Sequence, residues 1–139
     1  MLIAAQSLGI ALGAQDRALE YVKGREQFGK KIAQFQITQH KFADMATKIE
    51  TARLLTYKTA WDFDKGRKSA HGAAMAKIVS ARAALEVADE AIQLHGGYGY
   101  MTEYDVERFY RDAKIAELYG GNKETLKNII GQAVVGKIR

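Results

Sequence analysis

The sequence predicts an all-α fold, and three observations lead to this prediction. The chain has 139 residues, with 13 glycines and no proline. Because proline removes a hydrogen bond from the interior of a helix, its absence suits a chain made of long helices. Apolar residues recur at helical spacing, without strict apolar and polar alternation, and glycines stand where the helical periods end. The length suits one domain with a single core.

Five helices are expected, at residues of about 2–22, 34–64, 69–95, 103–115 and 122–137. Ser69 and Asn122 are suitable N-caps for the third and fifth helices, and Glu124 lies in a first turn, where the helix dipole favours negative charge. Gly96 and Gly97 supply the end of the third helix. Three long helices with short connections pack antiparallel, and the two shorter ones can fill the remaining side of an up-and-down bundle.

The composition narrows the classes of function. Lys and Arg number 21 against 16 Asp and Glu, a formal net charge of +5. The two signs are interleaved along the chain, which does not indicate nucleic acid binding. The absence of cysteine excludes disulfides and thiolate metal sites. Without a long apolar run or a signal-peptide pattern, we expect a soluble protein of the bacterial cytoplasm or, in a eukaryote, the mitochondrial matrix, with no membrane partner.

Two segments have residue types suited to binding a phosphate or an aromatic cofactor. Residues 23–30 break the helical period with two glycines and a cluster of charge, and are predicted to form a loop. In this loop Arg25 could present its guanidinium to a diphosphate, with Phe28 beside it. The turn at Gly96-Gly97 could let a flavin or phosphate approach the backbone closely. The alternatives are a solvated loop and an ordinary helix end.

The sequence does not predict a metal site or a nucleophile. His40, His71 and His95 are too scattered for metal-ligand spacing. Neither a Walker loop nor a Gly-x-Ser-x-Gly motif is present. No metal cofactor is therefore expected.

Three stretches match a known family in their order and spacing. The first reads Arg25-Glu26-Gln27-Phe28-Gly29-Lys30-Lys31, and is followed by Phe35-Gln36 and by Lys-Phe-Ala-Asp-Met at residues 41–45. The second is Ala-Ile-Gln-Leu-His-Gly-Gly-Tyr-Gly-Tyr at residues 91–100, and the third is Arg-Phe-Tyr-Arg-Asp-Ala-Lys at residues 108–114. Together they resemble the diagnostic segments of the C-terminal helical domain of the acyl-CoA dehydrogenase family, over essentially the whole chain.

The resemblance implies a domain organisation, a cofactor and partners. Residues 1–139 would form the four-helix-bundle domain of a larger three-domain chain, and this bundle would be the core of a homo-oligomer. The family oxidises acyl-CoA thioesters with FAD, and electron-transfer flavoprotein is the expected redox partner. Its flavin-contacting positions correspond here to Arg25, Phe28, Gln36, Gln93, Leu94, His95, Gly96, Gly97, Asn122, Lys123 and Glu124. Its substrate-binding positions correspond to Tyr119, Gly120 and Gly121.

The resemblance also raises the question of the catalytic base. Many members carry the base as the glutamate of a Tyr-Glu-Gly-Thr motif, and Gly120 occupies that position here. Its amide could still donate to the thioester oxygen, but glycine has no side chain to accept a proton. A Tyr-Gly-Gly run resembles the long-chain branch, whose glutamate would precede Met1. Within the chain, Glu117 and Glu124 are alternative bases.

Two classes of function therefore follow from the sequence. The first is a domain of an acyl-CoA dehydrogenase, with the isolated chain inactive. The second is a non-catalytic helical binding or assembly module. A flavin monooxygenase of the same fold is a related enzymatic alternative, in which a missing glutamate would be normal.

Overall fold

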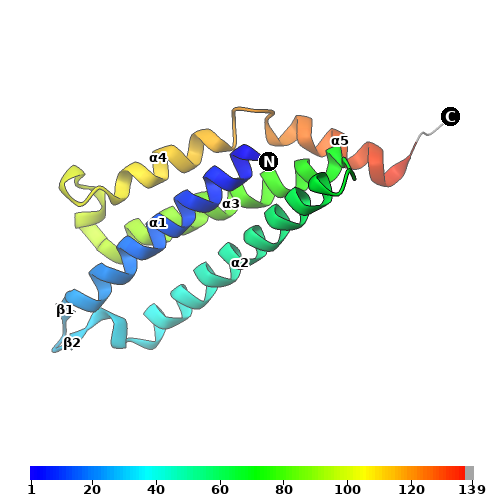
Figure 1. Cartoon of the computed structure of the whole chain (residues 1–139). Coiled ribbons are helices and arrows are strands. Elements are labelled where there is room, and N and C mark those ends of the chain that lie inside the picture. The colour runs from blue at the N-terminus through cyan, green and yellow to red at the C-terminus, as the bar shows by residue number, and fades with distance from the viewer. Residues whose placement is uncertain (137–139) are drawn as a thin grey trace.

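The computed structural model describes residues 1–136, and it is almost wholly helical. The α-helices in this part of the chain are α1 (Leu2–Gly24), α2 (Gln36–Asp64), α3 (Ala70–His95), α4 (Val106–Ala116) and α5 (Lys123–Val135). The first four run alternately up and down, with α1, α2 and α3 as the long elements (Figure 1). The predicted all-α, up-and-down four-helix bundle is confirmed.

Helix α3 is the centre of the bundle, because it packs against α1, α2, α4 and α5. Small residues dominate the buried positions of both α1 and α3, which lets their backbones approach closely. Larger side chains fill the rest of the core, among them Leu8, Val22, Met45, Ile49 and Leu85. The core therefore lies along the length of the long helices, and the connections at the two ends of the bundle are left to carry function.

Helix α5 differs from the prediction. Helix α4 closes the side of the bundle next to α1 and α3, as expected, but α5 packs mainly against α3 and projects past the end of the bundle (Figure 1). Its predicted end near residue 137 lies outside the described residues. Helix α4 begins later than expected, because Thr102–Tyr104 forms a 3-10 turn and Asp105 has a left-handed φ of 51°.

The predicted loop at residues 23–30 is instead a short β-hairpin, so that prediction was wrong. Strands β1 (Glu26–Gln27) and β2 (Lys30–Lys31) pair antiparallel around a two-residue turn. Both turn residues have positive φ, 54° at Phe28 and 73° at Gly29. A two-residue hairpin favours this conformation, but Asn or Gly normally supplies the first position. Because phenylalanine stands at that position, the sequence lacks the usual signal for this turn.

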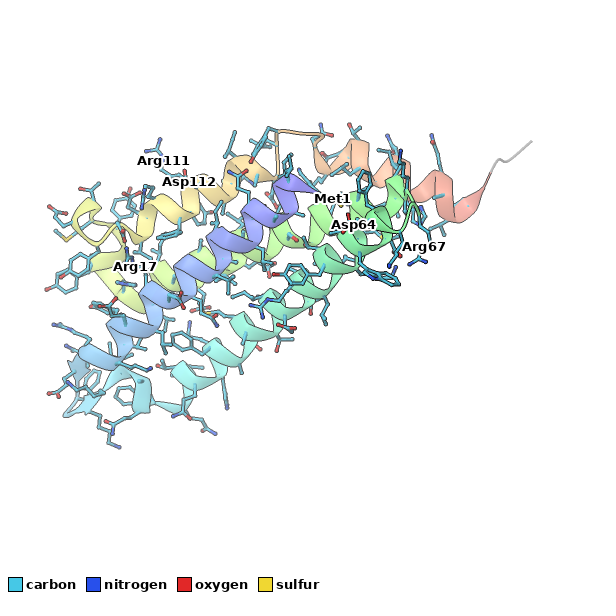
Figure 2. All side chains as sticks on the ribbon, in the orientation of Figure 1. Met1, Arg17, Asp64, Arg67, Arg111 and Asp112 are labelled. Carbon is cyan, nitrogen blue, oxygen red and sulfur yellow. The ribbon has the colours of Figure 1, made fainter. Side chains whose placement is uncertain are left out.

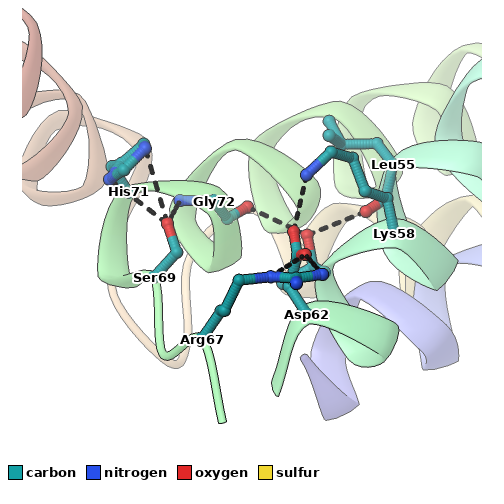
Figure 3. Close-up of polar contacts among 8 residues, drawn as sticks. Leu55, Lys58, Asp62, Arg67, Ser69, His71 and Gly72 are labelled. Carbon is teal, nitrogen blue, oxygen red and sulfur yellow. Dashed lines mark hydrogen bonds and ion pairs between the residues drawn. The ribbon is translucent and has the colours of Figure 1, made fainter. Parts of the chain in front are cut away.

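The connection between α2 and α3 is held by short-range polar contacts (Figure 3). Ser69 is the N-cap of α3, as predicted, and its Oγ accepts a hydrogen bond from the Gly72 N–H at 3.0 Å. Near the end of α2, Asp62 accepts hydrogen bonds from Lys58 at 2.5 Å and from the Arg67 side chain at 2.8 Å. These contacts fix the reversal of the chain and so the antiparallel packing of the two longest helices.

Candidate functional site at the two ends of the bundle

The residues predicted to bind cofactor and substrate fall into two groups at opposite ends of the bundle. Gly120 lies against Ile3 near the start of α1, whereas Arg25 follows the end of α1. A helix rises about 1.5 Å per residue, so the stretch between Ile3 and Arg25 separates the two groups by roughly 30 Å. Met1 accordingly lies at the end opposite the hairpin (Figure 2). One copy of the chain cannot bring both groups around one reacting centre.

Arg25 links the hairpin to the glycine turn after α3. Its guanidinium carbon lies 5.6 Å from the centre of the Tyr98 ring, within the range of a cation–π contact. Within residues 1–136 the Arg25 side chain pairs with no carboxylate. It is exposed, so its donors are available to an anionic group from outside the chain.

An aromatic cluster of Tyr21, His95 and Tyr104 packs between α1 and the segment after α3 at this end of the bundle. The Tyr21 and His95 rings stack with their centres 4.2 Å apart, and Tyr104 meets both rings edge-on. His95 is 5% exposed, and its Nδ1 lies 2.8 Å from the Ala91 carbonyl oxygen. Burial raises the pKa of Tyr21, and the nearby Arg25 charge opposes that shift. The cluster is therefore a fixed platform under Arg25.

The structure separates the predicted cofactor residues at this end into exposed and buried ones. Phe28 is 92% exposed at the hairpin tip, and Gln36 and Gln93 are also exposed. Leu94 and His95 are buried, so their side chains pack within the bundle and are not exposed to a ligand.

The two glycines after α3 have different roles in the fold. Gly96 needs its φ of 60° to end the helix. A Cβ added at Gly97 would meet nothing within 4 Å, and Gly97 has no positive φ. The fold of this chain therefore does not require glycine at 97, and the open backbone there suits close approach of a ligand.

At the other end, the turn Tyr119–Asn122 carries the predicted substrate residues. Gly120 and Gly121 have φ of 64° and 93°. A Cβ added at Gly120 would lie 1.9 Å from Ile3 Cδ1, so any side chain at this position requires the end of the Ile3 side chain to move and a strained left-handed backbone. Among the described residues, the Gly120 N–H donates to no acceptor, which leaves it free to donate to a ligand. The Tyr119 hydroxyl donates to the Gln6 side chain and ties the turn to α1.

Both alternative bases near this turn have structural partners. The Glu117 carboxylate accepts from Lys114 Nζ at 2.7 Å and is only 11% exposed. Glu124 is exposed in the first turn of α5, with Lys123 Nζ 3.9 Å away. Asn122 caps α5, as predicted, by accepting from the Thr125 N–H at 2.9 Å. Among the described residues, neither glutamate side chain forms a hydrogen bond with the Gly120 N–H.

Three residues important to these sites were missed by sequence reasoning. Tyr98 carries the Arg25 guanidinium, Ile3 fills the space beside Gly120, and Lys77 reaches the Tyr119–Asn122 turn from within α3. Lys77 looks like an ordinary surface lysine in the sequence, and only its burial distinguishes it.

Two absences hold for residues 1–136. No cluster of three or more His, Cys, Asp or Glu side chains is placed to hold a metal ion. Over the same residues, no helix combines the length and apolarity that crossing a bilayer requires.

Comparison with known proteins identifies the family. Residues 1–135 match the family described as "Acyl-CoA dehydrogenase, C-terminal domain". The chain belongs to this family. The predicted relationship is thereby confirmed, and the two ends of the bundle can be considered as parts of an acyl-CoA dehydrogenase C-terminal domain.

Individual relatives of this acyl-CoA dehydrogenase domain agree in sequence and structure. The chain is 43% identical to the caffeyl-CoA reductase–Etf complex subunit CarC of Acetobacterium woodii, covering 97% of this chain and 36% of that protein. Butyryl-CoA dehydrogenase from Megasphaera elsdenii superposes with a TM-score of 0.94 at 46% identity, covering 96% of this chain and 35% of that one. An FAD complex of PigA superposes at 0.90 and 30% identity, over 95% and 34% of the two chains. The chain thus spans about a third of the length of these relatives.

Proposed function

We propose that this chain is the C-terminal domain of an FAD-dependent acyl-CoA dehydrogenase, contributing flavin contacts and the oligomer core. The observation that carries the proposal is the hairpin end, where Arg25 has no carboxylate partner among residues 1–136 and Phe28 is fully displayed. An unpaired guanidinium suits a diphosphate, and the open backbone at Gly97 suits a flat ring. The family match and the FAD complex of a relative support FAD as the group bound there.

The reaction would desaturate the acyl chain next to the thioester carbonyl. A base would remove the proton from the carbon beside the carbonyl, and FAD, held in part by Arg25 and Phe28, would supply the acceptor for the hydride that leaves the next carbon. The Gly120 N–H would donate to the thioester oxygen and stabilise the charge that develops there. Tyr119 and Gly121 would form the walls of the same substrate turn.

The base would come from outside position 120. Position 120 has no carboxylate, its left-handed backbone and the contact with Ile3 disfavour a side chain there, and Glu117 is engaged with Lys114. Glu124 is explained by its place in the first turn of α5 beside Lys123, and we propose that the base is a glutamate outside residues 1–139, as the resemblance to the long-chain branch implies. General-base catalysis contributes about 10²–10⁴-fold, so its absence alone would leave the isolated chain nearly inactive.

The separation of the two groups supports a site built from more than one copy. Because Arg25 and Gly120 lie at opposite ends of the bundle, the hairpin end would contact the flavin of a neighbouring subunit. The proposed partners are therefore acyl-CoA, a second copy of the chain and electron-transfer flavoprotein. The Etf complex named for the Acetobacterium woodii relative supports the last of these. We place the protein in the bacterial cytoplasm or the mitochondrial matrix.

The test compares the 139-residue chain with the complete flavoprotein that contains this domain. Both are titrated with FAD and assayed with an artificial electron acceptor on acyl-CoA substrates of several chain lengths. We expect turnover only by the complete protein. Arg25→Ala should weaken its FAD affinity by about 10- to 150-fold, since a charge-assisted hydrogen bond contributes roughly 1.5–3 kcal/mol. Arg53→Ala, which removes an arginine paired with Glu50 on α2, is the matched control and should change nothing.

Two outcomes would contradict this proposal. Turnover by the 139-residue chain itself would mean that the base lies within the chain, with Glu117 and Glu124 as the candidates. A complete protein that holds FAD but oxidises no acyl-CoA would favour the non-catalytic module or the monooxygenase, which the lack of a carboxylate at Gly120 also suits.

A further inference from the structure

Lys77 is a buried cation directed at the backbone of the substrate turn. It lies within α3 and is only 4% exposed. Its Nζ donates to the Glu117 carbonyl at 3.2 Å and to the Gly121 carbonyl at 2.9 Å. A buried lysine is rare because desolvating its charge is costly, so its placement needs a reason beyond filling space.

The two acceptors of Lys77 stand on either side of Gly120. Between them the Leu118 and Tyr119 N–H groups donate to the Ile115 carbonyl, but among residues 1–136 the N–H groups of Gly120, Gly121 and Asn122 donate to no backbone acceptor. Further tethers come from α1, through Ile3 packing and the hydrogen bond between Tyr119 and Gln6, and from α5, where Asn122 accepts from the Thr125 N–H. Among residues 1–136, Lys77 is the one side chain that donates hydrogen bonds to backbone carbonyls on both sides of Gly120.

We propose that Lys77 is a positioning residue for the substrate turn. By holding the carbonyls of Glu117 and Gly121, its ammonium fixes the direction in which the free Gly120 N–H points. The inference rests on the proposed function in one respect, that this N–H is the donor to the thioester oxygen. A donor fixed in advance costs no reorganisation during the reaction, which is the condition for effective stabilisation of a developing oxyanion.

The surroundings of Lys77 act on its pKa in opposite directions. Burial lowers the pKa of Lys77 below the ordinary lysine value, and the Glu117 carboxylate opposes that shift. The same cavity is lined by further cations, Arg82, Lys123 and Lys127, and Lys114 pairs with Glu117 from α4. Titration of Lys77 should therefore begin at a lower pH than that of exposed lysines.

The first experiment compares Lys77→Met with Lys127→Met in the 139-residue chain. Methionine keeps much of the lysine stem but not the charge, and Lys127 lines the same cavity without a hydrogen bond to the turn. In Lys77→Met we expect the amide order parameters of residues 119–122 to fall from about 0.85 to below about 0.6, while those of the helices stay high. Lys127→Met should leave both unchanged. A rigid turn in Lys77→Met would overturn the proposal.

A second experiment restores the charge chemically. Because the chain has no cysteine, Lys77→Cys provides a single thiol. Aminoethylation of this thiol in unfolding solvent, followed by refolding, rebuilds a lysine-like ammonium, whereas carbamidomethylation adds a neutral group of similar size. Recovery of turn order with the first reagent alone supports charge positioning. Equal recovery with both reagents would mean that a neutral side chain of this length is sufficient and that the charge of Lys77 is not needed, and would overturn the proposal.

The native chain provides a third measurement, which does not depend on a variant folding. The signal of the carbon next to Lys77 Nζ and the α-carbon and carbonyl-carbon signals of Gly120 and Gly121, which do not depend on exchangeable protons, are followed as pH rises from 7 to about 11. The proposal requires a common midpoint, and turn signals that ignore the Lys77 titration would overturn it. None of these readouts uses flavin or acyl-CoA, so failure of the proposed function would leave them interpretable.

Discussion

Phe28 combines a left-handed backbone with a side chain that lies almost wholly in solvent. For an L-residue this conformation costs roughly 1–2 kcal/mol, and no buried contact of Phe28 compensates for it. We expect Phe28→Asn to stabilise the isolated chain by about 1 kcal/mol, because Asn-Gly suits both turn positions. Thermal unfolding measures the gain. Gly29→Ala, at the neighbouring left-handed position, should instead destabilise, and a stabilising effect there would contradict this account of the hairpin.

Gly120 is constrained twice, by its backbone and by Ile3. We expect Gly120→Ala to destabilise by about 2–3 kcal/mol, from the left-handed φ and from the clash with Ile3 Cδ1. Ile3→Val removes that one methyl group, so in its background the cost should fall by about 1 kcal/mol. Denaturant unfolding of the four proteins measures the coupling. Gly9→Ala, in α1 with no atom near an added Cβ, is the control and should stabilise slightly. Strict additivity would show that Ile3 does not exclude side chains from position 120.

The start of α3 depends on one local hydrogen bond. Ser69→Ala removes the acceptor for the Gly72 N–H and should cost about 1 kcal/mol in unfolding free energy. Ser69→Asp keeps a capping oxygen and should retain most of the stability. Both are measured by urea unfolding. A loss in Ser69→Asp as large as that in Ser69→Ala would indicate a packing effect and not a cap.

Two carboxylates should make the stability of the fold depend on acid pH, Asp62 near the end of α2 and Glu86 of α3, which pairs with Lys48 of α2. Lys58 and Arg67 hold the pKa of Asp62 below its usual range, and Lys48 and Arg82 do the same for Glu86. A carboxylate whose folded pKa is lowered contributes stability above its unfolded pKa, and this contribution is lost as pH falls through the folded value. Between about pH 5 and 2, Asp62→Asn and Glu86→Gln should therefore each lose less stability than the parent chain. An unchanged pH profile in both variants would contradict these pairings.

At the scale of the whole molecule, the surface of α2 away from α1 and α3 is unusually apolar. Leu54, Tyr57 and Trp61 are exposed at helical spacing along it. Such a face suits self-association, in agreement with the proposed oligomer. We expect sedimentation at micromolar concentration to reveal dimers or larger species, and Tyr57→Glu to shift them toward monomer without loss of helix. Arg111→Gln, which makes the same change in charge at an exposed position of α4, is the control. A strictly monomeric parent chain would contradict the prediction.

The sequence alone determined the features that depend on neighbours along the chain. Helical spacing, the caps at Ser69 and Asn122 and the glycine after α3 are local signals, so the four-helix bundle followed from them. The motifs that resemble the family supplied the candidate residues at each end of the bundle, but they did not distinguish exposed residues such as Phe28 from buried ones such as Leu94 and His95. The hairpin was not predicted because Phe28 is an unusual residue for its turn. The packing of α5 was not predicted because local spacing does not reveal which face a terminal helix packs against.

Only the tertiary structure decided how these residues combine. The contacts that define the substrate turn join positions far apart in sequence, 40 residues for Lys77 and Glu117 and 113 for Gln6 and Tyr119. The tertiary structure also places the two groups of candidate residues at opposite ends of one long helix. It buries Leu94 and His95 and brings Ile3 against Gly120. The physical reason is that burial and long-range hydrogen bonding depend on the packing of whole helices, whereas periodicity records only which side of each helix is apolar.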